Sequence, residues 1–368
     1  MKDSLAEALL GQVMEWDRTD IGTSHTLLSL QMLASQKYDG YERFRPGRKF
    51  IESLANWLRQ FRTVDERRAA LDFVKRRLLF ISNDEMEQLV GILYPKVIRP
   101  IIRHYVSNKL GVPKYAVRRI ENNQEFARVR RRSLFLGLSD GARMDEFRRS
   151  NRDLSTEQVY ATYEVSEPRL DEMRSQLLKE QEQDREESTR FELVFLIDDF
   201  AGSGKTILRE KDGAYQGRLK RFSDLLSSDS AAESSVFSGA DTEIHVCLYV
   251  ATKQAVDHLN QAFEDYTKVA AWACPPQVHF VQLLDGSHRI ECGDEPAFCA
   301  LLDDYYDPAI EDEAKQVGGS SSKLGFAKCA LPLVLSHNTP NNSISLLWAP
   351  SPMLALFPRF ERHSQRKA

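Results

Sequence analysis

Two adjacent carboxylates followed by a small-residue loop are the residues of this chain best suited to chemistry. Asp198 and Asp199 end a hydrophobic run, and the loop residues that follow Phe200 are Ala201, Gly202, Ser203, Gly204, Lys205 and Thr206. Main-chain N–H groups of such a loop, placed at the start of a helix, bind phosphate. The two acids can accept hydrogen bonds from neighbouring hydroxyl groups such as those of a ribose. The pattern therefore predicts a sugar-phosphate site.

The end of this loop also matches part of the nucleoside-triphosphate motif GxxxxGK[ST]. Gly204, Lys205 and Thr206 supply its last three residues, but Asp199 occupies the position of the first glycine. A carboxylate there would strain the turn and place negative charge close to phosphate oxygens. We favour the ribose-phosphate interpretation and keep a P-loop nucleoside triphosphatase as an alternative.

The elements that must position this loop are predicted from the spacing of apolar residues. Short apolar runs predict strands at residues 133–138, 191–197, 244–250 and 278–284. Amphipathic spacing predicts helices at residues 168–187, 217–226 and 253–266. We also expect a short helix beginning near Thr206, an edge strand within 159–165 and a disordered serine-rich stretch at 227–238. Strands that alternate with helices indicate an α/β fold with a parallel sheet.

The two ends of the chain differ from this central part. Residues 1–128 have helical spacing and no strand pattern, so we expect a helical N-terminal region. Near the other end, a helix is predicted at 296–306, and two apolar runs, 330–335 and 343–348, are predicted to form a hairpin. We therefore divide the chain into the N-terminal region, a core at 129–290 and a C-terminal extension at 291–368 that completes the domain.

The acidic pair and its loop resemble the signature of the type I phosphoribosyltransferase family. In that signature a hydrophobic strand is followed by two acids, an apolar residue, two small residues and then Thr/Ser-Gly-x-Thr. The matching residues of this chain are Asp198, Asp199, Phe200, Ser203, Gly204 and Thr206. The resemblance implies that the acids bind the ribose 2′ and 3′ hydroxyls of phosphoribosyl pyrophosphate. It also implies that the loop binds the 5-phosphate of this ligand.

An earlier loop, which we call the first loop, has the position that the same family uses for pyrophosphate, and the loop from Ala201 to Thr206 is then the second loop. The first loop consists of Ser139, Asp140, Gly141, Ala142 and Arg143 and follows the first predicted strand. Gly141 permits close approach of the backbone, and Arg143 would neutralise pyrophosphate through charge-assisted hydrogen bonds. The alternative is an ordinary polar turn. The residues between the two loops lie either in a mobile flap or in a solvated surface loop: Arg148, Arg149, Asn151 and Arg152.

The resemblance implies a displacement at C1 of the ribose, with Mg²⁺ and cationic groups stabilising the departing pyrophosphate. The acceptor stays open. The segments GLSDGAR, LIDDFAGSGKT and NTPNN also resemble phosphoribosyltransferase-like domains with a C-terminal extension from bacterial conflict systems. That narrower resemblance implies an antiphage effector controlled by partner proteins or nucleic acid. A non-catalytic module that senses a ribose phosphate or nucleotide is the alternative from a different class.

Charge and composition limit the partners. The net charge of -4 and the pI near 6.1 give no overall cationic signature for nucleic acid. Residues 96–132, however, carry eleven Lys and Arg against two Glu. This basic segment predicts contact either with nucleic-acid phosphates or with an acidic surface, such as residues 285–313, where ten acids accompany the single Arg289.

The remaining features indicate an ordinary cytoplasmic protein. No apolar run is long enough to span a membrane, and the N-terminus lacks the apolar core of a signal peptide. The five cysteines form no metal-binding pattern, so we expect reduced thiols and no protein-bound metal centre. His245 and His279 lie within apolar strand runs and are interpreted as core histidines.

Overall fold

The chain forms two compact units in a computed structural model that describes residues 3–17, 19–44, 47–181, 190–230, 235–238, 241–270, 272–311 and 321–359. The first, the terminal unit, combines Met1–Met86 with Asp285–Ala368, and the second, the sheet unit, consists of Glu87–Leu284. The predicted boundaries lie after residues 128 and 290. The units change earlier because the helices between residues 99 and 131 pack with the sheet unit.

A five-stranded parallel sheet is the centre of the sheet unit. Its strands are β2 (Ser133–Gly137), β3 (Val159–Tyr160), β4 (Leu193–Ala201), β7 (Glu243–Thr252) and β8 (Gln277–Leu284). They lie side by side in the order β3-β2-β4-β7-β8. The mixed α/β fold with a parallel sheet is therefore confirmed, and β3 is the predicted edge strand in a shorter form.

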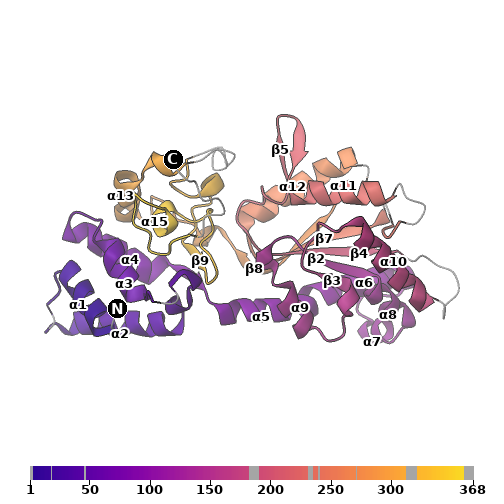
Figure 1. Cartoon of the computed structure of the whole chain (residues 1–368), viewed down its shortest axis with the longest axis horizontal. Helices are drawn as coiled ribbons and strands as arrows, with labels where there is room; N and C mark the ends of the chain where they lie inside the picture. The colour runs from indigo at the N-terminus through magenta and orange to yellow at the C-terminus, as the bar shows by residue number, and fades with distance from the viewer. Residues whose placement is uncertain are drawn as a thin grey trace. The chain divides into compact units, whose positions relative to one another are not determined.

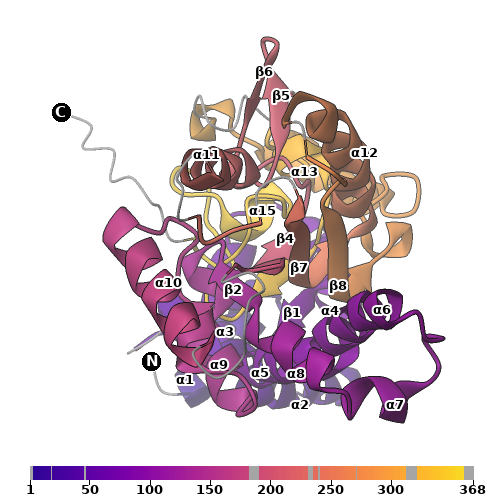
Figure 2. The same cartoon turned by 90° about the vertical axis from the view of Figure 1, so that its right-hand side faces the viewer.

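Helices cover both faces of this sheet, as expected for parallel strands that are apolar on both sides. Figures 1 and 2 show α11 (Arg218–Ser230) and α12 (Lys253–Ala270) on one face and α6 (Arg99–Leu110), α8 (Gln124–Arg131) and α9 (Met144–Ser150) on the other. The remaining helices of the unit are the π-helix η3 (Tyr94–Ile98), α7 (Val117–Glu121), η4 (Asp140–Ala142), η5 (Thr156–Gln158) and α10 (Glu167–Gln181). Residues 182–187 of the predicted α10 helix lie outside the described part of the chain.

The core of the sheet unit follows the two-residue period of its strands. Val194, Leu196 and Leu248 belong to a buried cluster with Leu219 of α11 and Leu259 of α12. The intervening side chains occupy the opposite face, where the rings of Phe135 and Phe195 stack at 5.2 Å and Phe147 of α9 lies 5.5 Å from Phe135. This alternation also determines where the acidic pair points.

The terminal unit joins the two ends of the chain around one core. Its helices are α1 (Asp3–Val13), α2 (Ile21–Gln36), η1 (Tyr38–Gly40), η2 (Glu42–Phe44), α3 (Phe50–Leu58), α4 (Val64–Arg77), η7 (Gly286–His288), α13 (Pro296–Tyr305), η8 (Pro308–Ile310), η9 (Phe326–Lys328) and α15 (Ser345–Trp348). The parallel strands β1 (Leu79–Ile81) and β9 (Leu333–Leu335) connect the two ends. Another helix, α5 (Asn83–Leu93), begins in the terminal unit and ends in the sheet unit.

Buried aromatic side chains hold the two ends together. Phe357, from the C-terminal part, lies within 6.1 Å of five rings, those of Tyr38, Tyr41, Phe44, Phe50 and Phe80. The indole N–H of Trp57 donates to the carbonyl oxygen of Leu346 at 2.8 Å. The C-terminal extension therefore shares a hydrophobic core with the N-terminal helices.

Four local predictions are wrong. No helix begins near Thr206, because the chain turns into an exposed hairpin of β5 (Arg209–Lys211) and β6 (Ala214–Gln216) before α11 starts. Residues 345–348 form α15 rather than a hairpin strand, since β9 pairs with the distant β1. β1 itself lies in the region predicted to be free of strands. Residues 227–230 of the stretch predicted to be disordered belong to α11. Val236, in the same stretch, accepts a hydrogen bond at its carbonyl oxygen from the N–H of Phe191 at 2.8 Å.

The expectation of reduced thiols is also corrected. Cys292 and Cys299 form a disulfide with their Cα atoms 5.5 Å apart, because the turn before α13 brings them together. Cys247, Cys274 and Cys329 are free thiols.

Candidate functional site

The two predicted loops meet at the carboxyl edge of the parallel sheet. After β2 the chain returns on one side as β3, and β4 lies on the other side of β2, so the strand order reverses between β2 and β4. Ligands of open α/β sheets bind outside the carboxyl ends of the strands at such a reversal. Ser139 to Arg143 follows β2, and the acidic pair ends β4. The topology thus gathers both loops where this class of fold places its ligands.

The two acids point to opposite faces of the sheet because successive side chains of a strand alternate. Asp198 has the parity of Val194 and Leu196, and it meets Arg218 from the α11 side. Asp199 has the opposite parity and lies against Gly141, where an added Cβ atom would be 2.4 Å from its Oδ2. The acids that are adjacent in the sequence therefore have different surroundings.

Asp198 is buried, and protein groups surround its carboxylate. Its Oδ1 accepts hydrogen bonds from the hydroxyl of Ser139 and, at 3.1 Å, from the N–H of Asp199, while its Oδ2 accepts from Nη1 of Arg218. Burial raises the pKa of Asp198, the charge of Asp199 raises it further, and Arg218 and Ser139 oppose these effects. Asp198 consequently links the first loop, β4 and α11.

Asp199 is more exposed than Asp198. Its Oδ1 accepts a hydrogen bond from the N–H of Phe200 at 2.8 Å. The close contact with Gly141 explains why a residue without a side chain is needed in the first loop: any larger residue would displace the carboxylate. The structure thus brings Gly141 and Asp199 together, as the sequence analysis expected of the two loops.

The loop after the acids packs tightly against α12. Gly204 has a φ of +72°, and a Cβ atom there would lie 2.9 Å from Cγ of Leu259. The hydroxyl of Thr252 donates to the carbonyl oxygen of Gly202 at 2.5 Å and accepts from the N–H of Ala255 at 3.0 Å. Ala201, Gly202, Ser203 and Gly204 are buried, Lys205 is partly buried and Thr206 is exposed.

Three main-chain donors of this loop have no acceptor in the part of the protein that the structure describes. Within the described residues, no protein acceptor is bonded to the N–H groups of Ser203, Gly204 and Thr206, whereas the N–H of Lys205 donates to the hydroxyl of Ser203 at 3.4 Å. Successive unpaired N–H groups in a turn form an anion-binding concavity. The loop can therefore hold a phosphate without a helix directly after it.

The inserted hairpin returns the start of α11 to the loop. The N–H groups of Arg218 and Leu219 donate to the carbonyl oxygens of Thr206 and Ile207 at 3.2 and 3.0 Å. These amides at the start of α11 bond the loop itself, and the hairpin takes the place of the helix predicted to begin near Thr206. Sequence reasoning missed Arg218 as a site residue, because it follows the acid by twenty positions in a segment predicted only as a helix.

The first loop is held in place from β7. The hydroxyl of Tyr249 donates to the carbonyl oxygen of Ala142 at 2.7 Å, and burial followed by the charge of Asp199 raises the pKa of this tyrosine. Arg143 adopts a left-handed conformation, and its Nη1 lies 3.3 Å from Oε2 of Glu146. Ser139 and Asp140 are partly buried and exposed, respectively. Arg143 is therefore beside the site but already has an acidic partner.

Of the residues predicted to lie in a flap or a surface loop, two belong to a helix, one follows its end, and Arg152 lies in an exposed turn. Arg148 and Arg149 lie on α9 and both pair with Asp145. Asn151 is buried at the end of this helix, where its side-chain amide donates to the carbonyl oxygen of Phe147 at 2.7 Å. Asn151 therefore ends a helix, and the two arginines have local partners.

Comparison with protein families agrees with this arrangement. The family model PRTase-CE matches residues 54–359. The chain belongs to the PRTase-CE family. Searches among curated proteins and solved structures gave no significant match. The predicted phosphoribosyltransferase-like domain with a C-terminal extension is thereby confirmed, and the PRTase-CE match includes helices from residue 54 onward that the sequence analysis had assigned to a separate region.

Most cations of the basic segment 96–132 are paired inside this PRTase-CE domain. Arg99 and Arg103 contact Glu121, Lys109 and Arg132 contact Glu192, and Arg131 contacts Glu157. Lys96 has no ion pair among the described residues but donates to the carbonyl oxygen of Val281 at 3.3 Å. The other exposed exceptions lie around the turn between α6 and α7, where Lys114, Arg118 and Arg119 have no ion pair among the described residues and Tyr115 is 83% exposed. We call these four residues the basic turn.

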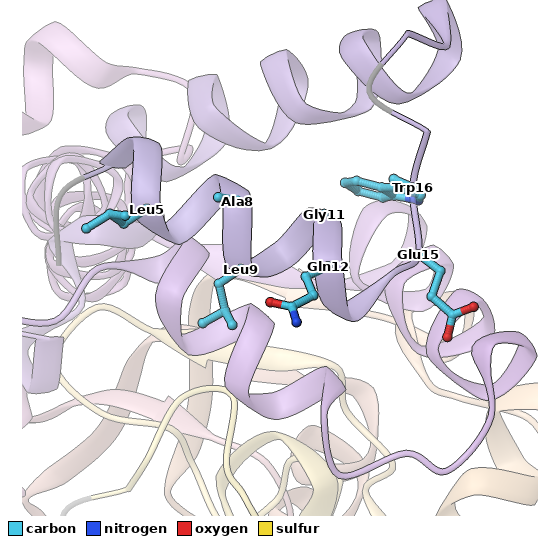
Figure 3. Close-up of a pocket in the computed structure, with 7 residues that line it drawn as sticks. All are labelled: Leu5, Ala8, Leu9, Gly11, Gln12, Glu15 and Trp16. Carbon is cyan, nitrogen blue, oxygen red and sulfur yellow. The ribbon is translucent and has the colours of Figure 1, made fainter.

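A groove is also present in the terminal unit of the PRTase-CE protein. It follows α1, has a volume of about 730 Å³ and is lined by the residues labelled in Figure 3: Leu5, Ala8, Leu9, Gly11, Gln12, Glu15 and Trp16. None of them is cationic, so this groove does not suit a phosphate. Among the described residues, no helix is both long and apolar enough to span a membrane, and no group of three or more His, Cys, Asp or Glu could hold a metal ion.

Proposed function

We propose that this PRTase-CE protein binds phosphoribosyl pyrophosphate, or a closely related ribose phosphate, at the carboxyl edge of its sheet. The meeting of the two loops at the strand-order reversal carries the proposal, with Gly141 against Asp199 and Ser139 bonded to Asp198. The N–H groups of Ser203, Gly204 and Thr206 suit the 5-phosphate, and Asp199 suits a ribose hydroxyl. The first loop, Ser139 to Arg143, contacts both acids and would hold the pyrophosphate.

Mg²⁺ would bind together with the ligand rather than at a site formed by protein ligands alone. Mg²⁺ keeps several waters and is commonly held by one or two carboxylates together with phosphate oxygens. Asp140 and Asp199, one on each loop, are the carboxylates that fit this description. When bound, the ion would neutralise charge on the pyrophosphate as it departs.

The chemistry that this site supports is transfer of the phosphoribosyl group. An electron pair of the acceptor forms the bond to C1 of the ribose, the bond from C1 to the pyrophosphate oxygen breaks, and its electrons leave with pyrophosphate. The acceptor loses a proton to solvent. The protein contributes by holding the sugar through Asp199 and the phosphate through the second loop, so that C1 faces the acceptor.

The P-loop alternative loses support from the structure. A Walker motif continues directly into a helix, whereas Thr206 is followed by a turn and the hairpin. A non-catalytic sensor stays open, since it would use the same donors for the same ligand. Release of pyrophosphate on incubation with an acceptor and Mg²⁺ separates the enzyme from the sensor.

Calorimetric titration with phosphoribosyl pyrophosphate and Mg²⁺ tests the proposal. We expect binding by the wild-type protein and a loss of roughly tenfold or more in affinity for Asp199→Asn, because a charged hydrogen-bond acceptor is removed. Asp257→Asn, an exposed acid paired with Lys253 on α12, is the matched control and should bind normally. Binding of ATP in place of the ribose phosphate, or no binding of either, would overturn the proposal.

For the protein's context we propose a defence effector that meets its partners through charge. The basic turn supports a partner bound through charge, because its cations have no ion pair among the described residues and its tyrosine is exposed for stacking on a base. Single-stranded nucleic acid is the partner that this combination of residues fits best. A protein component of a defence complex with an acidic surface is the alternative.

A further inference from the structure

We infer that Arg218 is a positioning residue of the candidate site, which holds Asp198 as a fixed anchor of the two loops and leaves Asp199 as the acid that meets the sugar. The inference rests on the proposed function and divides the acidic pair between two roles. We therefore expect Asp198 to bond protein groups only and Asp199 to be the acid that contacts the ligand.

The first observation is the burial of the pair. The side chains of Arg218 and Asp198 are 13% and 3% exposed, and Nη1 of Arg218 donates to Oδ2 of Asp198. A buried ion pair cannot lose one partner without leaving an uncompensated charge. Arg218 thus neutralises a carboxylate that water does not solvate.

The second observation is that both carboxylate oxygens of Asp198 already accept hydrogen bonds from the protein. Oδ1 accepts from the hydroxyl of Ser139 in the first loop and from the N–H of Asp199 in β4, while Oδ2 accepts from α11 through Arg218. One carboxylate therefore connects three segments of the site. With 3% of its side chain exposed, Asp198 offers little surface to a ribose hydroxyl.

The third observation is how the chain delivers Arg218. The β5–β6 hairpin separates the second loop from α11 and then returns the chain, so that the N–H of Arg218 bonds Thr206 at 3.2 Å. Gly217 has a φ of +125°, and a Cβ atom there would lie 2.4 Å from the carbonyl oxygen of Ile207. This conformation suits glycine alone, and it places the arginine at the first position of the helix.

The strand geometry gives Asp199 the other role. Its side chain leaves β4 on the side opposite to Arg218 and reaches Gly141, and its carboxyl group, which also contacts that of Asp198, is partly exposed. The main-chain donors for a phosphate lie four to seven positions further along the chain. Asp199 is therefore the member of the pair that a sugar attached to that phosphate can reach.

The test is a charge-rescue cycle with two readouts. We expect Arg218→Met to lower the affinity for phosphoribosyl pyrophosphate and Mg²⁺ by roughly tenfold or more, because Asp198 loses its charged donor. Adding Asp198→Asn should restore part of this affinity, since the buried charge is gone, whereas adding Asp199→Asn should lower the affinity further. Arg221→Met is the matched control, because Arg221 lies one turn further on α11 and is exposed with its partner Glu164.

The second readout is unfolding in urea without ligand, which keeps the inference separate from the proposed function. If the wild-type protein binds no ribose phosphate, the proposed function fails, and the same cycle in unfolding still measures the coupling of Arg218 with Asp198. If the wild-type protein binds but Arg218→Met binds equally well, or Asp198→Asn gives no rescue in either readout, the inference is overturned. Arg218→Lys should retain more affinity than Arg218→Met, because it keeps the charge.

Discussion

At the scale of single residues, the acidic pair shows why neighbouring identical side chains need not share a role. Successive side chains of a strand alternate, so Asp198 meets Arg218 at the start of α11 and Asp199 meets Gly141 in the first loop. The motif gives the two residue types but not this division. The division depends on Arg218, which the hairpin brings from a later part of the chain.

The pH dependence of stability should reveal the ion pair of Asp198. Burial and the charge of Asp199 raise the pKa of Asp198 above 3.8, and Arg218 lowers it, so removing Arg218 raises the pKa further. A carboxyl with a higher pKa in the folded chain binds its proton more tightly there, and stability therefore falls as the pH rises from the ordinary value through the folded one. We expect urea unfolding of Arg218→Met and wild type to differ little near pH 4 and increasingly toward pH 8. An equal difference at both pH values would contradict this.

Gly141 offers a second test at this scale. A methyl group at this position would begin 2.4 Å from Oδ2 of Asp199, so Gly141→Ala must displace the carboxylate. Because a small misplacement in a site is costly, we expect affinity for the ribose phosphate to fall roughly 10- to 100-fold in titration. Gly91→Ala is the control, since nothing lies within 4 Å of the added atom. Unchanged affinity in Gly141→Ala would show that the contact has no part in binding.

At the scale of elements, the sequence predicts the sheet well and the connections poorly. The strands around Phe195, Val246 and Val281 are long apolar runs whose type does not depend on distant partners. The hairpin at 209–216 has exposed, charged residues without a strong alternating pattern. β1 and β9 are three residues each and exist because they pair with one another across the chain, which no local pattern records.

Two histidines on adjacent strands should make stability sensitive to acid. Nδ1 of His245 lies 3.1 Å from Nε2 of His279, and burial together with His245 lowers the pKa of His279 from 6.5 to about 4. The unfolded chain binds more protons than the folded chain between these values, so stability falls as the pH decreases through this window. Glu243, 3.7 Å from Nε2 of His245, is the nearest acid with an ion contact to the pair.

Substitution of His279 by glutamine tests this pair. We expect the free energy of unfolding of His279→Gln to change less than that of wild type between pH 7 and pH 4.5, with a difference on the order of 2 kcal/mol. Urea unfolding at several pH values measures it. His288→Gln, in the terminal unit, serves as the control. Parallel curves for His279→Gln and wild type would contradict the prediction.

The basic turn gives a prediction for the α6–α7 connection. Reversing both Arg118 and Arg119 to Glu should weaken binding of a single-stranded oligonucleotide about tenfold or more and reduce the slope of log affinity against log salt. Fluorescence anisotropy over a salt series measures both. The control replaces Lys253 and Lys268 by Glu, which changes the net charge by the same amount; both lysines pair with acids on α12. Equal effects of both double variants, or no binding by wild type, would favour a protein partner.

At the scale of the whole molecule, the ends of the chain form a unit that sequence reasoning treated as two regions. Helical spacing identifies α3 and α4, and the apolar runs near residue 330 are evident, but nothing local indicates that they share a core. Phe50 and Phe357 are three hundred and seven positions apart and stack at 5.6 Å. The PRTase-CE match begins at residue 54, so several rings around Phe357 lie before it.

Removal of the Phe357 ring should therefore destabilise the terminal unit while leaving the candidate site intact. Phe357→Ala empties a fully buried position among five aromatic rings, which commonly costs about 3–5 kcal/mol. The residues of the site belong to the sheet unit and to a separate buried cluster, so affinity for the ribose phosphate should stay near that of wild type below the first transition. Thermal unfolding followed by calorimetry and titration at low temperature measure the two quantities.

Leu354→Ala, close by in the chain and 47% exposed, is the control and should change neither. Loss of ligand binding in folded Phe357→Ala would show that the two cores are coupled, and an unchanged unfolding temperature would show that the ring contributes little to the terminal unit.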